Sequence, residues 1–197
     1  AQSQFISGKY RLLTVLGEGA MGMVYRADQL DAQGHSLREV ALKMVQPAFS
    51  RDPDFAQRFL REVRVAARLR SPHTVTVYDT GQTEQGQFYY VMELVRGPTL
   101  KEILQRSGPL PVERAVRIVG QVCDALAEAH SQPEPIVHRD LKPANIFVEE
   151  RQGQDWAKVG DFGIAKIVGE HSSGLTHTGA SPGTPRYMAP EQWMGRE

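Results

Sequence analysis

The chain has 197 residues, 41% hydrophobic and 23% charged, and its 23 Lys and Arg residues balance 23 Asp and Glu residues. A net charge of zero argues against non-specific binding to nucleic acid or anionic membranes, but it leaves room for a local phosphate site. No apolar run reaches the roughly 18 residues of a membrane span, and the single cysteine, Cys123, excludes an internal disulfide and a cysteine-rich zinc cluster.

The first half of the chain is expected to form a sheet with one helix. Five segments have the composition and spacing of strands, namely 10–17, 23–27, 39–45, 74–81 and 87–94. Apolar residues at helical spacing predict a helix over 52–70, with Asp52 as its N-cap and Pro53 at its first position. The composition changes at 95–100, which is the best candidate for a hinge.

The second half is expected to be mainly helical. The predicted elements are a short helix at 100–107, a long helix at 111–130 and a hairpin formed by 145–150 and 156–161. The long helix places Val112, Val116, Val119, Cys123, Leu126 and His130 close to helical period. The last thirty-odd residues are rich in Ser, Thr, Gly and His, which is typical of a long loop.

The stretch GEGAMGMV at 17–24 contains a G-x-G-x-x-G pattern, which by itself is a weak signal. In a dinucleotide-binding turn a helix begins at the third glycine, whereas here Met23, Val24 and Tyr25 favour a strand. The segment is therefore either a tight hairpin turn or a flap whose backbone N–H groups approach phosphate oxygens. A dinucleotide-dependent oxidoreductase is excluded on the same ground.

Three residues, Ala41, Lys43 and Glu62, sharpen the phosphate interpretation. Ala41 and Lys43 are two residues apart in a strand, so they face the same side, where a flat ring and its phosphate can lie. Glu62 falls within the apolar stripe of the predicted helix, and a carboxylate there needs a partner such as a buried lysine. The alternative is a tilted helix with Glu62 at the rim of the stripe.

The loop HRDLKPAN at 138–145 concentrates chemical groups that act on phosphate. A carboxylate at Asp140 can align a hydroxyl and accept its proton, and Lys142 can neutralise a phosphoryl group in transfer. The amide oxygen of Asn145 and the carboxylate of Asp161 are ligands of the kind that Mg²⁺ prefers. One such residue is unremarkable in a surface loop, but the whole set in this order indicates phosphoryl transfer.

Together these motifs resemble the eukaryotic-type Ser/Thr protein kinases, most of all their bacterial branch. The matches are the glycine loop 17–24, VALK with Lys43, Glu62, HRDLKPAN at 138–145, DFG at 161–163 and APE at 189–191. The resemblance implies an α+β, two-lobed protein-kinase-like fold. Its N-lobe, a small antiparallel sheet with one helix, is expected over 1–94, and a partial, mainly helical C-lobe over 95–197.

The resemblance also implies that ATP and Mg²⁺ are the cofactors and that Ser and Thr hydroxyls of protein substrates accept the γ-phosphoryl group. Lys43 is expected to hold the α- and β-phosphates and pair with Glu62, and Asp140 is expected to be the catalytic base beside Lys142. Asn145 and Asp161 are the expected metal ligands. The other expected ATP-binding residues are Leu16, Gly17, Glu18, Gly19, Gly22, Val24, Ala41, Met92 as gatekeeper, Glu93, Leu94 and Val95 as hinge, and Phe147 beneath the adenine.

Further expectations concern regulation. By the same resemblance, Thr176 and Thr178 are candidates for autophosphorylation, with Arg139 as the partner of the new phosphate, although a solvated loop with incidental threonines is the alternative. His138 is expected to be a packing residue rather than a base. Gly160, before the DFG motif, is expected to leave space behind the adenine site.

The family pattern continues past APE through further helices that this sequence lacks, including one that supplies an arginine for Glu191. The helix 111–130 is then expected to expose apolar residues, and the chain to self-associate or to bind a partner there. An alternative function is a catalytically impaired, nucleotide-binding or scaffold module with a kinase-like fold. The expected location is the cytoplasm.

Overall fold

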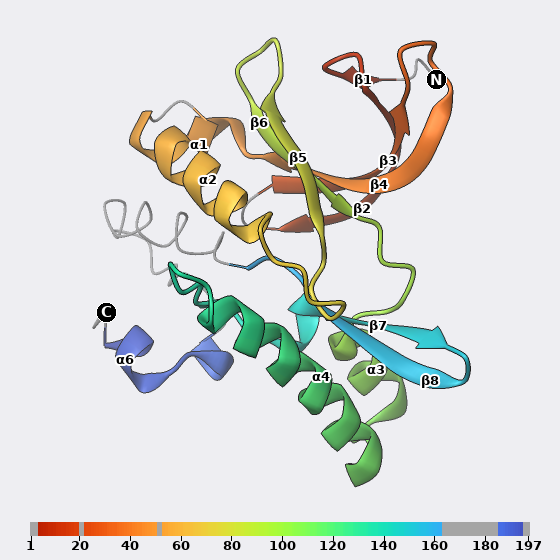
Figure 1. Cartoon of the computed structure of the whole chain (residues 1–197), viewed down its shortest axis with the longest axis vertical. Helices are drawn as coiled ribbons and strands as arrows, with labels where there is room; N and C mark the ends of the chain where they lie inside the picture. Colours follow the sequence, from red (N-terminus) through yellow and green to blue (C-terminus); the bar gives the residue numbers. More distant parts are fainter. Residues whose placement is uncertain (1–3, 20–21, 51–52, 163–184, 195–197) are drawn as a thin grey trace. The chain divides into compact units, whose positions relative to one another are not determined.

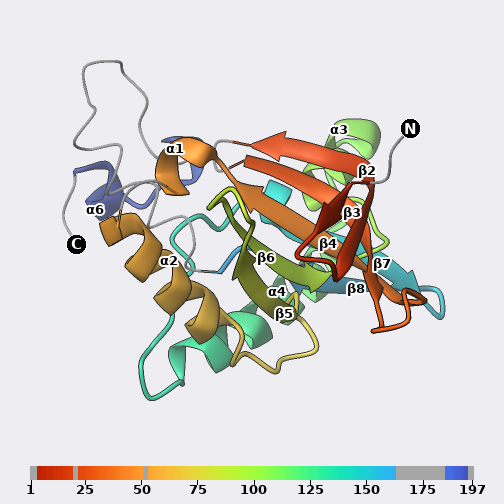
Figure 2. The same ribbon diagram turned by 90° about the horizontal axis from the view of Figure 1, so that it is seen from above.

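The computed structural model describes residues 4–19, 22–50, 53–162 and 185–194. The chain divides into two compact units, which consist of residues 1–67 with 76–94 and of residues 68–75 with 95–197. Residues 68–75 therefore cluster with the second unit, although they lie in the half of the sequence, 1–94, that was expected to form the N-lobe. Figures 1 and 2 show the elements of each unit.

The first unit is built on a six-stranded antiparallel sheet with the order β1-β2-β3-β4-β6-β5. The strands are β1 (Phe5–Ile6), β2 (Tyr10–Gly19), β3 (Gly22–Leu30), β4 (Ser36–Val45), β5 (Val77–Gln82) and β6 (Phe88–Glu93). The five expected strands are confirmed, and β1 is a sixth that the sequence did not predict. Two residues are too few to show a strand period.

One face of this sheet carries a continuous apolar core. Its buried residues are Ile6, Tyr10, Ala27, Val40, Leu42, Met44, Tyr89 and Val91. The Tyr10 hydroxyl donates a hydrogen bond of 2.7 Å to Asp79 Oδ2, and burial together with this bond raises the pKa of Tyr10 well above its ordinary value. Because Ile6 of β1 joins this core, the short first strand is part of the folded unit.

Two helices complete the first unit, α1 (Pro47–Ser50) and α2 (Pro53–Ala66). The α2 helix buries Phe55, Phe59 and Val63, and the Phe59 ring lies 6.1 Å from the ring of Tyr90 on β6. The expected N-cap, Asp52, lies outside the described residues. Aromatic packing between helix and sheet thus fixes α2 beside the strand that pairs with β4.

The second unit contains helices and a two-stranded sheet. Its elements are α3 (Leu100–Ser107), α4 (Val112–His130), the 3₁₀ turn η1 (Pro143–Asn145), β7 (Ile146–Arg151), β8 (Gln154–Val159), the 3₁₀ turn η2 (Pro185–Tyr187) and α6 (Pro190–Trp193). The α3 helix begins with a capping box, in which Thr99 and Glu102 bond to each other's backbone N–H groups. The two predicted helices and the hairpin are confirmed.

Two side chains of α4 bind the β7–β8 hairpin. The Arg114 guanidinium donates two hydrogen bonds to the carboxylate of Asp155, at 2.9 and 2.8 Å. Gln121 donates to the Asp155 carbonyl and accepts from the N–H of Ala157. These contacts hold the hairpin that ends at the DFG motif against α4.

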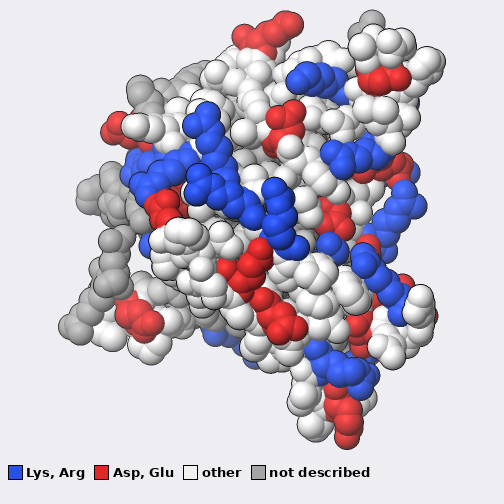
Figure 3. All heavy atoms as spheres, viewed as in Figure 1, with Lys and Arg blue, Asp and Glu red and all other residues white. Residues whose placement is uncertain are grey.

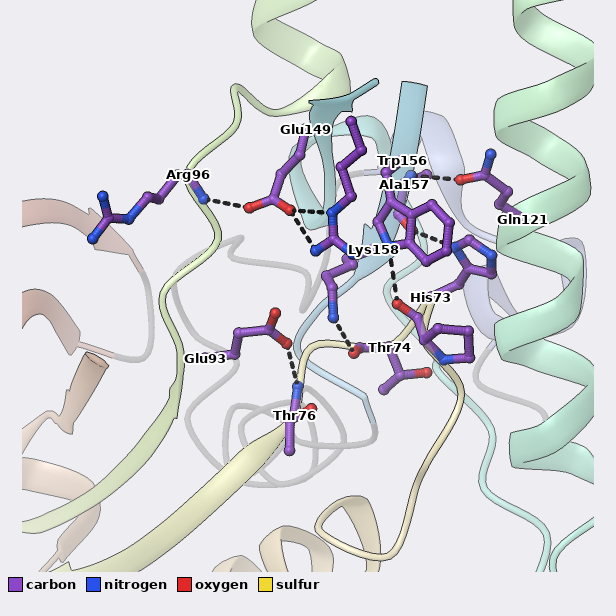
Figure 4. A network of polar contacts seen from close by, with 12 residues as sticks. His73, Thr74, Thr76, Glu93, Arg96, Gln121, Glu149, Trp156, Ala157 and Lys158 are labelled. Atoms are coloured by element: carbon purple, nitrogen blue, oxygen red, sulfur yellow. Dashed lines mark hydrogen bonds and ion pairs between the residues drawn. The ribbon is translucent and has the colours of Figure 1, made fainter. Parts of the chain in front are cut away.

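Residues 68–75 join the second unit because they pair with β8. The N–H of Val75 donates to the Val159 carbonyl at 2.9 Å, and the N–H of Val159 donates to the His73 carbonyl at 2.8 Å. The His73 ring lies 4.6 Å from the ring of Trp156, and Figure 4 shows the two side chains next to each other. Trp156 Nε1 donates to the Pro72 carbonyl. A loop between α2 and β5 thus behaves as an added strand of the hairpin.

One face of α4 is apolar and exposed. Val112 is 72%, Val116 65% and Val119 55% exposed, and Cys123 continues the row one turn later. The opposite face is buried and consists of Ile118, Val122, Ala125 and Ala129. The expected exposure of apolar residues on this helix is confirmed.

The charged residues follow the balanced composition. Lys and Arg side chains and Asp and Glu side chains both occur on the face shown in Figure 3. Within the part of the chain that is described, no helix combines the length and hydropathy needed to cross a membrane.

Candidate functional site

The glycine loop occupies the β2–β3 hairpin, where Gly17 pairs with Val24 and Gly19 with Gly22. Gly22 has φ 136°, and a Cβ there would lie 1.9 Å from the Met44 carbonyl oxygen, so the close passage of β4 requires a glycine. A Cβ on Gly17 or Gly19 would meet no atom within 4 Å. Packing therefore explains Gly22 and leaves Gly17 and Gly19 unexplained. A strand, and not a helix, thus begins at Gly22, as the sequence predicted.

The expected partners of a nucleotide in the first unit lie on one face of the sheet. Val24 is directly opposite Lys43 in the β3–β4 ladder, and Ala41 is opposite Met92 on β6. Ala41 and Lys43 are both buried and are two residues apart in an unbroken strand, so they share a face. Leu16 and Glu18 are exposed. This brings together the ammonium group, the small alanine and Val24.

The ammonium of Lys43 lies 5.7 Å from the centre of the Tyr90 ring. Glu62 is only half-buried, whereas Phe55, Phe59, Val63 and Ala66 of the same helix are buried. Among the described residues, no ion pair or hydrogen bond joins Lys43 to Glu62. The expectation that Glu62 lies in the middle of the apolar stripe is wrong, because its partial exposure fits the alternative position at the rim of the stripe.

The expected hinge, 93–95, follows β6. The N–H of Glu93 donates to the Thr76 carbonyl at 2.8 Å, and its carboxylate accepts from the N–H of Thr76 at 3.3 Å (Figure 4). Leu94 and Val95 follow directly after the end of β6.

The loop 138–145 brings its three functional side chains into direct contact. Lys142 Nζ lies 2.6 Å from Asp140 Oδ2, and the Asn145 amide donates to the same oxygen at 3.2 Å. The amide also donates to the Asp140 carbonyl at 2.8 Å. Because both amide protons point toward Asp140, the Asn145 carbonyl oxygen faces elsewhere and is available to a hard cation.

His138 connects this loop to the DFG motif. It is 2% exposed, its Nε2 donates to the Gly160 carbonyl at 2.8 Å, and its Nδ1 accepts from the N–H of Asp140 at 3.3 Å. Burial lowers the pKa of His138, which keeps the ring neutral with one donor and one acceptor. Its ring also lies 4.8 Å from the buried ring of Phe162. A neutral, fully bonded imidazole has the properties of a packing residue.

Two residues in this region hold unusual backbone conformations. Arg139 has φ 65° and Asp161 has φ 59°, in the left-handed region that costs non-glycine residues about 1–3 kcal/mol. Such strain persists where surrounding contacts impose it, and it is concentrated at functional sites. Here it lies at the residue before Asp140 and at Asp161 itself.

Gly160 does not leave the space that the sequence suggested. A Cβ there would lie 3.1 Å from the Phe147 ring and 3.4 Å from Val75. Phe147 and the added strand of residues 68–75 fill the region. This expectation was wrong because the position of Val75 depends on a pairing that the sequence does not reveal.

Asn145 and Asp161 fit the expected magnesium site in their donor chemistry. Both offer oxygen, and Mg²⁺ binds carboxylate and carbonyl oxygens. Gly163 of the DFG motif and the candidate phosphorylation sites Thr176 and Thr178 lie outside the described residues. One contact was not anticipated: the Gln192 side chain donates to the Arg139 carbonyl at 2.9 Å. Nothing in the sequence around Gln192, which follows the APE motif, indicates a contact with Arg139.

The sequence matches the family model of the protein kinase domain over residues 10–196. It is 45% identical to the Ser/Thr-protein kinase pkn3 of Myxococcus xanthus, over 98% of this chain and 35% of that protein. It is 44% identical to the Ser/Thr-protein kinase PknD of Mycobacterium tuberculosis, over 99% of this chain and 27% of that protein. The chain thus spans about a third or less of the length of these relatives.

Solved structures agree with this result. The crystal structure of the Mycobacterium tuberculosis PknI kinase domain is 33% identical, with a TM-score of 0.73, and the match covers 100% of this chain and 69% of that one. The expected kinase-like fold is therefore confirmed, and the chain belongs to the protein kinase domain family.

Proposed function

We propose that the chain supplies the ATP-binding and catalytic residues of a Ser/Thr protein kinase. The reaction transfers the γ-phosphoryl group of ATP to a Ser or Thr hydroxyl of a protein substrate. The oxygen of the hydroxyl forms a bond to phosphorus, the bond from phosphorus to the ADP oxygen breaks, and the hydroxyl proton is released. An ATP-dependent reaction of this kind belongs in the cytoplasm.

The observation that carries this proposal is the arrangement of Asp140, Lys142 and Asn145. The Asp140 carboxylate, 2.6 Å from the Lys142 ammonium, can align the substrate hydroxyl and accept its proton. Lys142, which already lies beside Asp140, can stabilise charge on the transferring phosphoryl group. The loop itself therefore provides the groups that proton transfer and charge stabilisation need.

The nucleotide is proposed to bind residues of both units. Gly17 and Gly19, which packing does not require, let the backbone approach the phosphates, and Lys43 holds the α- and β-phosphates. Val24, Ala41 and Phe147 are proposed to contact the adenine, and the backbone of 93–95 to bond to its edge. The expected Lys43–Glu62 pair is proposed for the nucleotide-bound form. When bound, Mg²⁺ neutralises phosphate charge, and Asn145 and Asp161 hold it.

Transfer from radiolabelled ATP to a generic Ser/Thr substrate tests the proposal. Asp140→Asn should abolish transfer and leave Mg-ATP affinity within a few fold, because the amide cannot accept the proton. Lys43→Ala should weaken ATP binding and transfer together. If both variants transfer phosphate at the parent rate, the assignment is wrong. If the parent chain binds Mg-ATP but transfers nothing, the alternative of a nucleotide-binding scaffold is favoured.

A further inference from the structure

Three side chains bond to the two peptide groups that flank the Cα of Asp140. The His138 ring accepts from the Asp140 N–H, and the Asn145 amide donates to the Asp140 carbonyl. The third is Gln192 of α6, whose Nε2 donates to the Arg139 carbonyl at 2.9 Å. His138 and Asn145 belong to the same loop as Asp140, whereas Gln192 is 53 positions from Arg139.

The orientation of the Gln192 amide follows from a second contact. Its Oε1 accepts a hydrogen bond of 3.1 Å from the N–H of Ala189, at the start of α6. Because an N–H can only donate, the oxygen of the amide must face Ala189, and its NH₂ must face the Arg139 carbonyl. The side chain therefore bridges the first turn of α6 and the catalytic loop with one donor and one acceptor.

The bond to Arg139 acts on a strained part of the chain. Arg139 has φ 65°, which a non-glycine residue adopts only where its surroundings hold it. Its carbonyl belongs to the planar peptide group that continues to Asp140, so a bond to this oxygen fixes the plane of that group. The orientation of that plane influences the direction of the Cα–Cβ bond of Asp140, and so the position of its carboxylate.

We propose that Gln192 is a positioning residue for Asp140, the proposed catalytic base. It holds the Arg139–Asp140 peptide group in the orientation that aligns the carboxylate with the substrate hydroxyl. Asp140 Oδ2 is also held by Lys142 and Asn145, so loss of Gln192 weakens the alignment and does not abolish it. The positioning role rests on the proposed function, whereas the hydrogen bond itself does not.

A simpler role for Gln192 is to cap the first turn of α6 through the Ala189 N–H alone. Two substitutions of similar shape separate the roles. Gln192→Glu keeps an oxygen that accepts from Ala189 but has no proton to donate to the Arg139 carbonyl. Gln192→Met loses both contacts. A capping role predicts that the glutamate variant behaves as the parent does, and a positioning role predicts that it is impaired at least as much as the methionine variant.

The experiment measures kcat and the KM for ATP of the full chain and both variants, with the thermal midpoint as a control for folding. We expect kcat to fall about two- to tenfold in both, as the loss of one hydrogen bond allows, with KM for ATP and the midpoint nearly unchanged. The positioning role is overturned if the glutamate variant keeps the parental kcat, or if each fall in kcat is accompanied by a fall in the thermal midpoint.

The ¹³C chemical shift of the Arg139 carbonyl provides a readout that needs no activity. This carbon responds to hydrogen bonds that its oxygen accepts, so the shift should change in both variants relative to the parent. An unchanged shift in both overturns the inference whatever the kinetics show. If the parent transfers no phosphate, the proposed function fails, and so does the positioning role, while a changed shift would still establish the hydrogen bond.

Discussion

The glycines of the β2–β3 hairpin allow fold and function to be separated by one type of substitution. In Gly22→Ala the added Cβ would lie 1.9 Å from the Met44 carbonyl oxygen, at a φ of 136°. In Gly17→Ala and Gly19→Ala the added Cβ meets no atom within 4 Å. The same chemical change should therefore destabilise the first unit at one position and only impair ligand binding at the other two.

The magnitudes follow from these contacts. The unfavourable backbone conformation costs about 1–3 kcal/mol, and moving β4 by more than an ångström adds roughly 1–3 kcal/mol. Gly22→Ala should thus lose about 2–6 kcal/mol of the free energy of unfolding, which is a large part of a typical domain's stability of about 5–15 kcal/mol. Gly17→Ala and Gly19→Ala should stay within about 0.5 kcal/mol of the parent.

Denaturant unfolding and Mg-ATP titration of the three variants test this reasoning. Gly17→Ala and Gly19→Ala should weaken ATP affinity by about tenfold or more, since a methyl group hinders backbone hydrogen bonds to charged phosphate. The reasoning is refuted if these two variants bind ATP as the parent does, or if they lose as much stability as Gly22→Ala.

Three further predictions concern the second unit. Burial keeps the pKa of His138 below its ordinary 6.5, so the unfolded chain takes up a proton first as the pH falls. The contribution of the neutral ring to the free energy of unfolding is complete above about pH 6.5 and declines below it. In denaturant unfolding, the parent should therefore lose more stability between about pH 7.5 and pH 5.5 than His138→Phe does. An equal loss in the two proteins contradicts the assignment. Gly160→Ala should cost about 1 kcal/mol in the same assay, because the Cβ presses on the Phe147 ring at 3.1 Å, and an unchanged or increased stability would show that the ring moves freely. The exposed valines of α4 should cause self-association, which light scattering measures. Val116→Lys should reduce it, whereas the control Gln105→Lys, at another exposed position, should not. A monodisperse parent monomer counts against this prediction.

The sequence predicted the strands and helices with regular patterns and the family to which the chain belongs. Apolar, β-branched and aromatic runs identified β4 and β6, whose residues 40–45 and 88–91 are buried on both faces. Helical spacing identified α2 and α4, because each buries one face over several turns. The motif residues could be named because phosphate chemistry restricts which side chains serve it. What these patterns share is that neighbours in the sequence carry the information.

The features that were missed depend on distant parts of the chain. The β1 strand forms because Ile6 enters a core made by later strands, and residues 68–75 join the hairpin only through Val159. The position of Glu62 relative to the stripe requires the exact phase of α2, which Phe59 sets against Tyr90. The bond from Gln192 to Arg139 joins residues 53 positions apart, and no local pattern records it.

The central claim is that Lys43 and Asp161 act on one bound Mg-ATP. Paramagnetic relaxation with Mn²⁺ in place of Mg²⁺ tests it in solution, because Mn²⁺ broadens amide signals of residues close to the metal. With ATP and Mn²⁺ present, we predict broadening of Gly17, Gly19 and Lys43 in the first unit and of Asn145 and Asp161 in the second, and its loss in Asp161→Asn. Broadening confined to one unit, or unchanged in Asp161→Asn, would contradict the claim.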